Sequence, residues 1–121
     1  MKPKEAEDKA QRWLEKKYGN KTFAKKNLAI GRTEWEFDLV SDDASEGSRI
    51  VAEVKTRKAE TTEQQFITVF KRGFIFDCLK LEKVKARKKY FFLATSRDVY
   101  NKFIKKAEGL ICDDVEFIRL S

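Results

Sequence analysis

The chain has 121 residues, of which 41% are hydrophobic and 10 are Phe, so we expect one buried core and a single domain over residues 1–121. It carries 27 Lys and Arg against 20 Asp and Glu, a net charge of +7 that favours a polyanionic partner such as nucleic acid. It contains no His, which excludes Ser-His-Asp and Cys-His nucleophiles, His-ligated zinc and a His general base. An enzyme built from this chain would work with carboxylates, lysines, hydroxyls and a hard metal ion.

The first segment has no apolar run that would act as a secretion signal, and no stretch approaches transmembrane length. Cys78 and Cys112 lie far apart in apolar surroundings, which favours free, buried thiols over a disulfide. We therefore expect a cytoplasmic protein without a membrane partner. No feature of the sequence points to a small-molecule substrate.

The chain begins with a predicted helix, ended by Gly19 and Asn20, whose apolar residues recur at three- and four-residue spacing. A strand is predicted over residues 23–30, and a second over residues 33–40, where apolar and acidic residues alternate. A polar loop over residues 41–48 leads to a return strand over residues 49–55, which completes a hairpin. In the alternating strand, one face carries Trp35, Phe37 and Leu39, and the other carries Glu34, Glu36 and Asp38.

Thr61 and Thr62 offer capping-box starts for a second helix that runs to about Val84. A buried strand over residues 89–95, a helix over residues 97–108 and an edge strand over residues 115–120 follow. The order is helix, three strands, helix, strand, helix, strand, which predicts an α/β fold with a mixed sheet covered by helices on both sides. The inner stripe of the second helix is predicted to be Phe66, Val69, Phe70, Phe74, Cys78 and Leu81.

Two charged residues interrupt the aliphatic return strand of the hairpin. Glu53 and Lys55 share one face of this strand, and charged groups are costly to place against a core unless they are paired or functional. With the loop centred near Ser45, Asp38 lies opposite Glu53 and Glu36 lies opposite Lys55. The plain structural alternative is a wet hairpin face with cross-strand ion pairs. It accounts for Glu36 with Lys55, but not for two like charges facing each other.

Two facing carboxylates repel unless a cation lies between them. Mg²⁺ binds one or two carboxylates and keeps its remaining positions for water and phosphate, so the pattern predicts a Mg²⁺ site, with Mn²⁺ as a substitute. Lys55, beside this ion, would hold a phosphate oxygen or orient the attacking water. Its ordinary pKa of about 10.4 disfavours a role as the base.

Three segments, "AEDKAQRWLEKKYG", "WEFDLV" and "VAEVKTRK", resemble in order and spacing the PD-(D/E)XK nuclease superfamily. The nearest members are the small archaeal Holliday-junction resolvases and an uncharacterised bacterial endonuclease-like family. Phe37 replaces the proline that names the motif. The resemblance implies a restriction-endonuclease-like fold, with an αβββαβ core and a C-terminal helix and strand. It also implies a Mg²⁺-dependent endonuclease that hydrolyses structured or branched DNA in repair or recombination.

Carried over by position, the resemblance implies that Asp38 and Glu53 are metal ligands, joined by the Val54 carbonyl, and that Lys55 is the catalytic lysine. Glu7 would be an accessory carboxylate that reaches the site from the first helix. An acidic residue in a first helical turn also complements the helix dipole, so a purely structural role for Glu7 stays open.

Nucleic-acid contacts are predicted from the basic residues that surround this motif and from the second helix. The resemblance implies a polar contact from Gln65, or from Gln64, although both also suit a helix cap. The basic candidates join the dense run over residues 80–89, which otherwise reads as a solvated helix end. Without a recognition helix or zinc module, backbone- or shape-directed binding is favoured. The basic candidates are Arg57, Lys58, Lys71 and Arg72.

Three further alternatives remain at this stage. Apolar residues beyond the inner stripe of the second helix indicate either deep burial or a homodimer interface. The chain could also be a noncatalytic nucleic-acid-binding or scaffolding domain with a nuclease-like fold. An RNA-directed nuclease would use the same chemistry.

Overall fold

The computed structural model describes residues 1–57, 74–107, 110 and 114–121. The predicted caps of the second helix, its first turns, Gly109 and Cys112 lie outside these residues. Cys78 is buried and free, as predicted. The elements are α1 (Pro3–Lys17), β1 (Phe23–Ile30), β2 (Thr33–Ser41), β3 (Ile50–Thr56), α3 (Ile75–Lys83), β4 (Lys88–Ala94), α4 (Arg97–Ala107) and β5 (Val115–Leu120).

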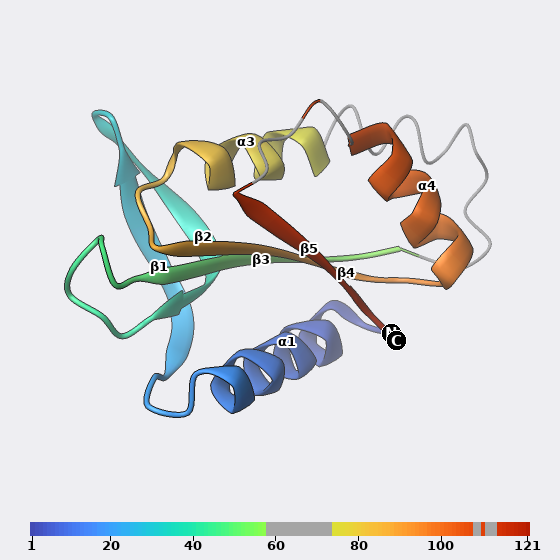
Figure 1. The fold of residues 1–121 in the computed structure, drawn as a ribbon, viewed down its shortest axis with the longest axis horizontal. Coiled ribbons are helices and arrows are strands. Elements are labelled where there is room, and N and C mark those ends of the chain that lie inside the picture. Colours follow the sequence, from blue (N-terminus) through green and yellow to red (C-terminus); the bar gives the residue numbers. More distant parts are fainter. Residues whose placement is uncertain (58–73, 108–109, 111–113) are drawn as a thin grey trace.

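The strands form one five-stranded sheet in the order β1-β2-β3-β4-β5. β1, β2 and β3 pair antiparallel, whereas β3, β4 and β5 pair parallel, with α3 and α4 in the crossovers. Figure 1 shows α1 on one side of the sheet and α3 and α4 on the other. The predicted α/β fold with a mixed sheet and helices on both sides is therefore confirmed.

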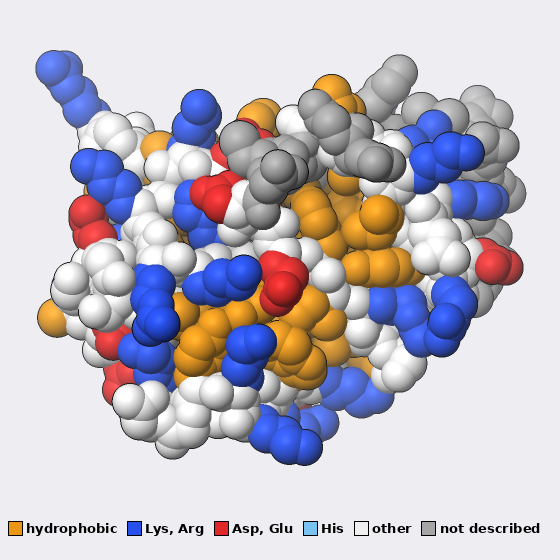
Figure 2. Space-filling view, viewed as in Figure 1, with side chains coloured by type: hydrophobic (Ala, Val, Ile, Leu, Met, Phe, Trp, Pro, Cys, Tyr) orange, Lys and Arg blue, Asp and Glu red, His pale blue; other side chains and the backbone are white. Residues whose placement is uncertain are grey.

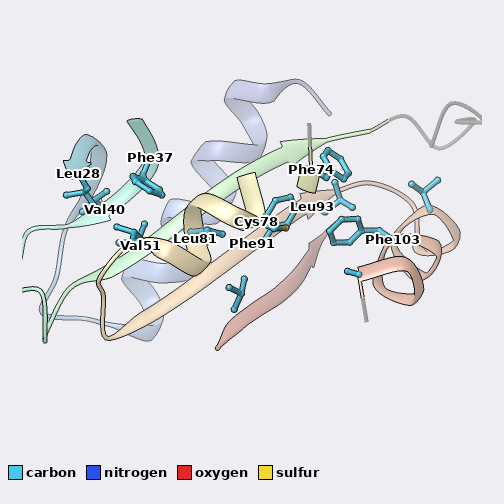
Figure 3. Close-up of a cluster of buried hydrophobic side chains, with 14 residues drawn as sticks. Leu28, Phe37, Val40, Val51, Phe74, Cys78, Leu81, Phe91, Leu93 and Phe103 are labelled. Carbon is cyan, nitrogen blue, oxygen red and sulfur yellow. The ribbon is translucent and has the colours of Figure 1, made fainter. Parts of the chain in front are cut away.

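The side of the sheet that faces α3 and α4 carries the larger of two buried clusters. Its aromatic centre is Phe91, whose ring stacks on Phe103 at 5.4 Å between centroids and meets Phe74 edge-on at 5.7 Å. Such pairs add to the free energy gained by burying the rings. Figure 3 shows Phe37, Val40, Val51, Leu81 and Cys78 in the same layer.

The opposite side of the sheet packs on α1. Ala6, Ala10 and Leu14 follow the helical repeat and are fully buried. The two small Ala side chains let the helix approach the sheet closely. Trp13 meets the ring of Tyr90 edge-on at 5.4 Å. The parallel strand β4 contributes to both clusters, which explains its nearly unbroken apolar sequence.

The alternation predicted for β2 is wrong at one point. Phe37 packs toward α3, whereas Leu39 packs toward α1, although a regular strand would send both to one face. The register of β1 and β2 shifts there: Ala24 lies opposite Val40, but Lys26 lies opposite Phe37. The extra residue on β2 is a β-bulge. It places the side chains before and after the bulge, next to Asp38, on opposite sides of the sheet, whereas regular alternation would place them on one side.

In the part of the chain that the structure describes, no helix combines the length and apolar character needed to cross a membrane.

Phe91→Ala should lower the free energy of unfolding by about 3–5 kcal/mol, because it empties the centre of the α3–α4 cluster. Urea denaturation measures this loss. Phe76→Ala is the matched control: its ring is 48% exposed, and we expect a loss below about 1.5 kcal/mol. Equal losses for the two variants would contradict the assignment of Phe91 to the core.

Candidate active site

The site is built around Glu53, which is 2% exposed in the middle of the central strand β3. Strand alternation places Glu53 on the same side as Val51, under α3. A carboxylate in this position would be strongly unfavourable unless neighbouring charges and hydrogen bonds compensate for lost water. Its neighbours therefore determine what the site can do.

Asp38 reaches this region from β2, directly beyond the last paired residues of the β2–β3 ladder. The ladder between β2 and β3 pairs Val40 with Val51 and Leu39 with Ala52, and the same register would continue to Asp38 opposite Glu53. There the pairing stops, and the backbone N–H of Val54 donates a hydrogen bond to Asp38 Oδ2 at 2.8 Å. The side chain of Asp38 thus replaces a lost ladder bond and lies next to β3.

Two residues of α3 complete the cluster, and sequence reasoning did not find their role. Lys80 Nζ lies 3.5 Å from Glu53 Oε1 and 3.7 Å from Asp77 Oδ1, and it donates to the Glu36 carbonyl at 2.8 Å. Asp77 in turn lies 2.9 Å from Lys55 Nζ. Asp77 and Lys80 are 10% and 13% exposed at the side chain, so this is a buried network of alternating charges.

The sequence carried a signal for this pair. Asp77 and Lys80 are three residues apart and adjoin Cys78 and Leu81 of the inner stripe. Charges at helical spacing beside a buried stripe indicate a partner across the interface. In the sequence, Lys80 also belongs to the dense basic run over residues 80–89, which conceals its pairing with Asp77.

The network strongly perturbs Glu53. Burial, followed by the charge of Asp38, raises the pKa of Glu53 to about 8, although Lys80 and Lys55 oppose the shift. Desolvation and a like charge both disfavour the ionised carboxylate. At neutral pH, Glu53 therefore retains a proton unless additional positive charge reaches the site.

Lys55 is held as an ammonium. Burial acts to lower its pKa, but the hydrogen bond to Asp77 and the neighbouring carboxylate charges outweigh burial and raise the pKa above the ordinary value. The predicted pairing of Lys55 with Glu36 is not observed. The β2–β3 ladder ends at Leu39, so Glu36 has no partner residue on β3. It lies opposite Asn27 of β1, with its carboxylate 4.0 Å from Lys25 Nζ.

The donor set suits a hard divalent cation. Asp38 and Glu53 offer carboxylate oxygens from adjacent strands, and the raised pKa of Glu53 is the response of a buried acid that lacks enough positive charge. Within the described ranges, no group of three or more His, Cys, Asp or Glu side chains gathers as a metal cluster. A two-carboxylate site of the kind that Mg²⁺ uses fits these residues.

Other predicted site residues lie elsewhere. Glu7 of α1 is 4.0 Å from Lys25, which lies equally far from Glu36, so Glu7 connects to the hairpin rather than to Glu53. Arg57 is half-buried, with its guanidinium 5.8 Å from the centre of the Phe74 ring. Lys58, Gln64, Gln65, Lys71 and Arg72 lie outside the described residues.

Basic side chains are spread over the surface. Figure 2 shows Lys and Arg distributed across the visible face, with fewer Asp and Glu among them. On this face the basic side chains are dispersed rather than gathered in one narrow strip.

No family model matches the chain, and no curated protein matches it. Among solved structures, a chain described as "Protein of Unknown Function AF1548" is similar, with a TM-score of 0.48 and 17% sequence identity over 93% of this chain. The present chain spans 55% of the length of that protein. A likeness at this level carries no conclusion about function.

Glu53→Gln should flatten the dependence of stability on pH. The folded-state pKa of about 8 lies above the ordinary 4.5, so the folded protein keeps a proton that the unfolded chain releases. The resulting stability is fully present below pH 4.5 and is lost as pH rises through 8. Urea denaturation in metal-free buffer from about pH 5 to about pH 9 measures this slope. The control is Glu46→Gln in the exposed β2–β3 loop, which should keep the wild-type slope. A Glu53→Gln slope equal to that of the control would refute the assignment.

Proposed function

We propose that this protein is a Mg²⁺-dependent endonuclease of the PD-(D/E)XK type that hydrolyses phosphodiester bonds of DNA, with structured or branched DNA as its substrate. The observation that carries the proposal is the buried Glu53 beside Asp38, with Lys55 kept as an ammonium on the same strand. A carboxylate pair short of positive charge and a fixed cation together match the needs of phosphodiester hydrolysis.

Asp38, Glu53 and the Val54 carbonyl are the groups that would hold the metal ion. When bound, the ion would supply a water of lowered pKa and stabilise negative charge on the phosphate. Asp38 is already fixed for this role, because the bond from the Val54 N–H orients its carboxylate toward β3. Preorganisation of this kind lowers the cost of assembling a site on its substrate.

Lys55 contributes charge and orientation. Because its pKa is raised, it is protonated at neutral pH and can donate to a phosphate oxygen or to the attacking water. It cannot accept the proton of that water while it is an ammonium. Asp77 is the positioning residue: its carboxylate, 2.9 Å away, fixes the Lys55 ammonium next to Glu53.

The substrate class rests on charge. A net charge of +7, dispersed over the surface in Figure 2, attracts a polyanion without requiring base recognition. Contacts to the phosphate backbone position a nucleic acid but do not select a sequence. Structure-directed cleavage is therefore favoured over sequence-directed cleavage.

Lys55→Ala and Glu53→Ala should each lower the cleavage rate with Mn²⁺ by on the order of 100-fold or more, because Lys55 supplies positive charge to the transition state and Glu53 is a ligand of the metal ion. The measurement is a cleavage panel on junction, flap and single-stranded DNA and on RNA. Lys102→Ala, an exposed lysine on α4, is the control and should cleave as wild type does.

Three outcomes of this panel would count against the proposal. Cleavage that survives in both active-site variants would remove these residues from the chemistry. No cleavage by the wild type on any substrate would favour a noncatalytic nucleic-acid-binding domain. Faster cleavage of RNA than of DNA would redirect the assignment to an RNA nuclease.

Lys80→Met should strengthen Mn²⁺ binding by about tenfold or more, because the Lys80 ammonium, 3.5 Å from Glu53 Oε1, competes with the ion for that carboxylate. Methionine keeps the apolar stem of the side chain and removes the charge, together with the hydrogen bond to the Glu36 carbonyl. Calorimetry or electron paramagnetic resonance without nucleic acid measures the affinity. Asp38→Asn should abolish binding, and Lys83→Met, an exposed lysine on the same helix, should leave it unchanged. Equal or weaker Mn²⁺ binding by Lys80→Met would show that Lys80 does not compete.

A further inference from the structure

An apolar hollow of about 160 Å³ lies between the β1–β2 hairpin and α3. It is smaller than the roughly 300 Å³ at which pockets begin to enclose drug-sized molecules. Its size therefore suits one planar ring rather than an extended ligand. The lining residues are Ile30, Trp35, Phe76, Leu79, Lys80 and Lys83.

The walls of the hollow are aromatic and open to solvent. Trp35 meets Phe76 edge-to-face, with ring centroids 5.5 Å apart and an angle of 64° between the rings. Trp35 is 36% exposed, Phe76 48% and Leu79 44%. Five large hydrophobic side chains are exposed among the described residues, and these three gather in one place, which marks an interaction site rather than scattered surface apolar residues.

Lys80 joins this hollow to the candidate active site. Its side chain lines the hollow, while its ammonium contacts the Glu53 carboxylate at 3.5 Å and lies over the Phe37 ring at 5.0 Å. Lys83, one turn further along α3, adds an exposed positive charge at the hollow. The side chain of Lys80 would therefore separate an occupant of the hollow from the Glu53 carboxylate.

We propose that the hollow receives one unpaired nucleobase of a single-stranded DNA segment, next to the phosphate presented to Glu53 and Lys55. The inference rests on the proposed function for the location of the phosphate. Aromatic side chains beside a basic surface bind single strands by stacking on bases and attracting phosphates, without sequence preference. The site would thereby select substrates that have an unpaired base beside the cleaved bond.

Charge complementarity favours this occupant over a second copy of the chain. Each copy carries +7, and a symmetric contact through the hollow would bring Lys80 and Lys83 of both copies together. An apolar peptide would leave the exposed ammonium of Lys83 without a counter-charge, whereas Lys80 is already paired with Glu53 and Asp77. A nucleotide supplies both a flat apolar ring and a phosphate anion.

Trp35 fluorescence tests the proposal directly. The chain has two Trp, so Trp13→Phe leaves Trp35 as the single tryptophan emitter. We expect a short oligo(dT) strand, added in EDTA, to quench this emission, and Phe76→Ala to weaken binding by about tenfold. The matched control is Leu110→Ala, which truncates an exposed apolar side chain outside the hollow and should leave affinity unchanged.

Two further strands separate stacking from general attraction to phosphate. A strand with abasic sites and a fully paired duplex both carry the phosphates but offer no free base, so neither should quench Trp35. An oligonucleotide containing 2-aminopurine, bound to the protein with both tryptophans intact, gives a second readout that does not depend on Trp13→Phe. Its emission should fall on binding, and less so with Phe76→Ala.

The proposal is overturned if abasic and oligo(dT) strands bind equally, or if Phe76→Ala and Leu110→Ala behave alike. It is also overturned if sedimentation shows a dimer that Phe76→Ala dissociates, since a second copy would then occupy the hollow. Lys55→Ala separates this inference from the proposed function: it should still show the Trp35 quenching and its dependence on Phe76, with an affinity lowered by the lost phosphate contact, but fail to cleave. Normal quenching with undiminished cleavage by Lys55→Ala would remove the proposed chemistry and leave the base site.

Discussion

The structure depends on the compensation of one buried carboxylate. Glu53 lies in the middle of a central strand, where an isolated ionised acid could not be accommodated. Lys80 reaches it from α3, Asp77 holds Lys80 and Lys55, and Asp38 approaches from β2. Removing one partner of such a network leaves an uncompensated charge, which costs far more than a surface ion pair contributes. The position of α3 over the sheet is thus tied to the same charges that form the candidate active site.

Much of the fold followed from local pattern. β1 and β5 have the predicted bounds, and β3, β4 and α4 differ by a residue or so at their ends. These segments are bounded by turn residues and have a clear apolar period, which tertiary packing reinforces. The register of the β2–β3 hairpin was also predictable, because the observed pairing of Leu39 with Ala52 is centred between Ser45 and Glu46, next to the predicted centre near Ser45. Asp38 and Glu53 could therefore be brought together from the sequence.

The remainder of the site could not be predicted, because it depends on contacts between distant elements. Asp77 and Lys80 lie on a helix that follows β3 by a crossover, and local pattern does not specify which part of the sheet that helix covers. The bulge in β2 also depends on a contact between strands. Trp35, Phe37 and Leu39 alternate regularly in the sequence, so only the pairing with β1 shows the extra residue. The hollow at Trp35 and Phe76 likewise joins a hairpin to a helix 41 positions further along the chain (76 − 35).

The ladder between β2 and β3 is much shorter than the ladder between β3 and β4. Only two residue pairs join β2 and β3, whereas β3 and β4 are joined along seven. The β1–β2 hairpin is therefore joined to the parallel strands by a short ladder, which ends beside Asp38. The Val54 N–H is hydrogen-bonded to the Asp38 carboxylate. The rate at which its proton exchanges with deuterated solvent therefore reports how often this bond between β2 and β3 opens. One backbone amide thus records whether the two acids are together at any moment.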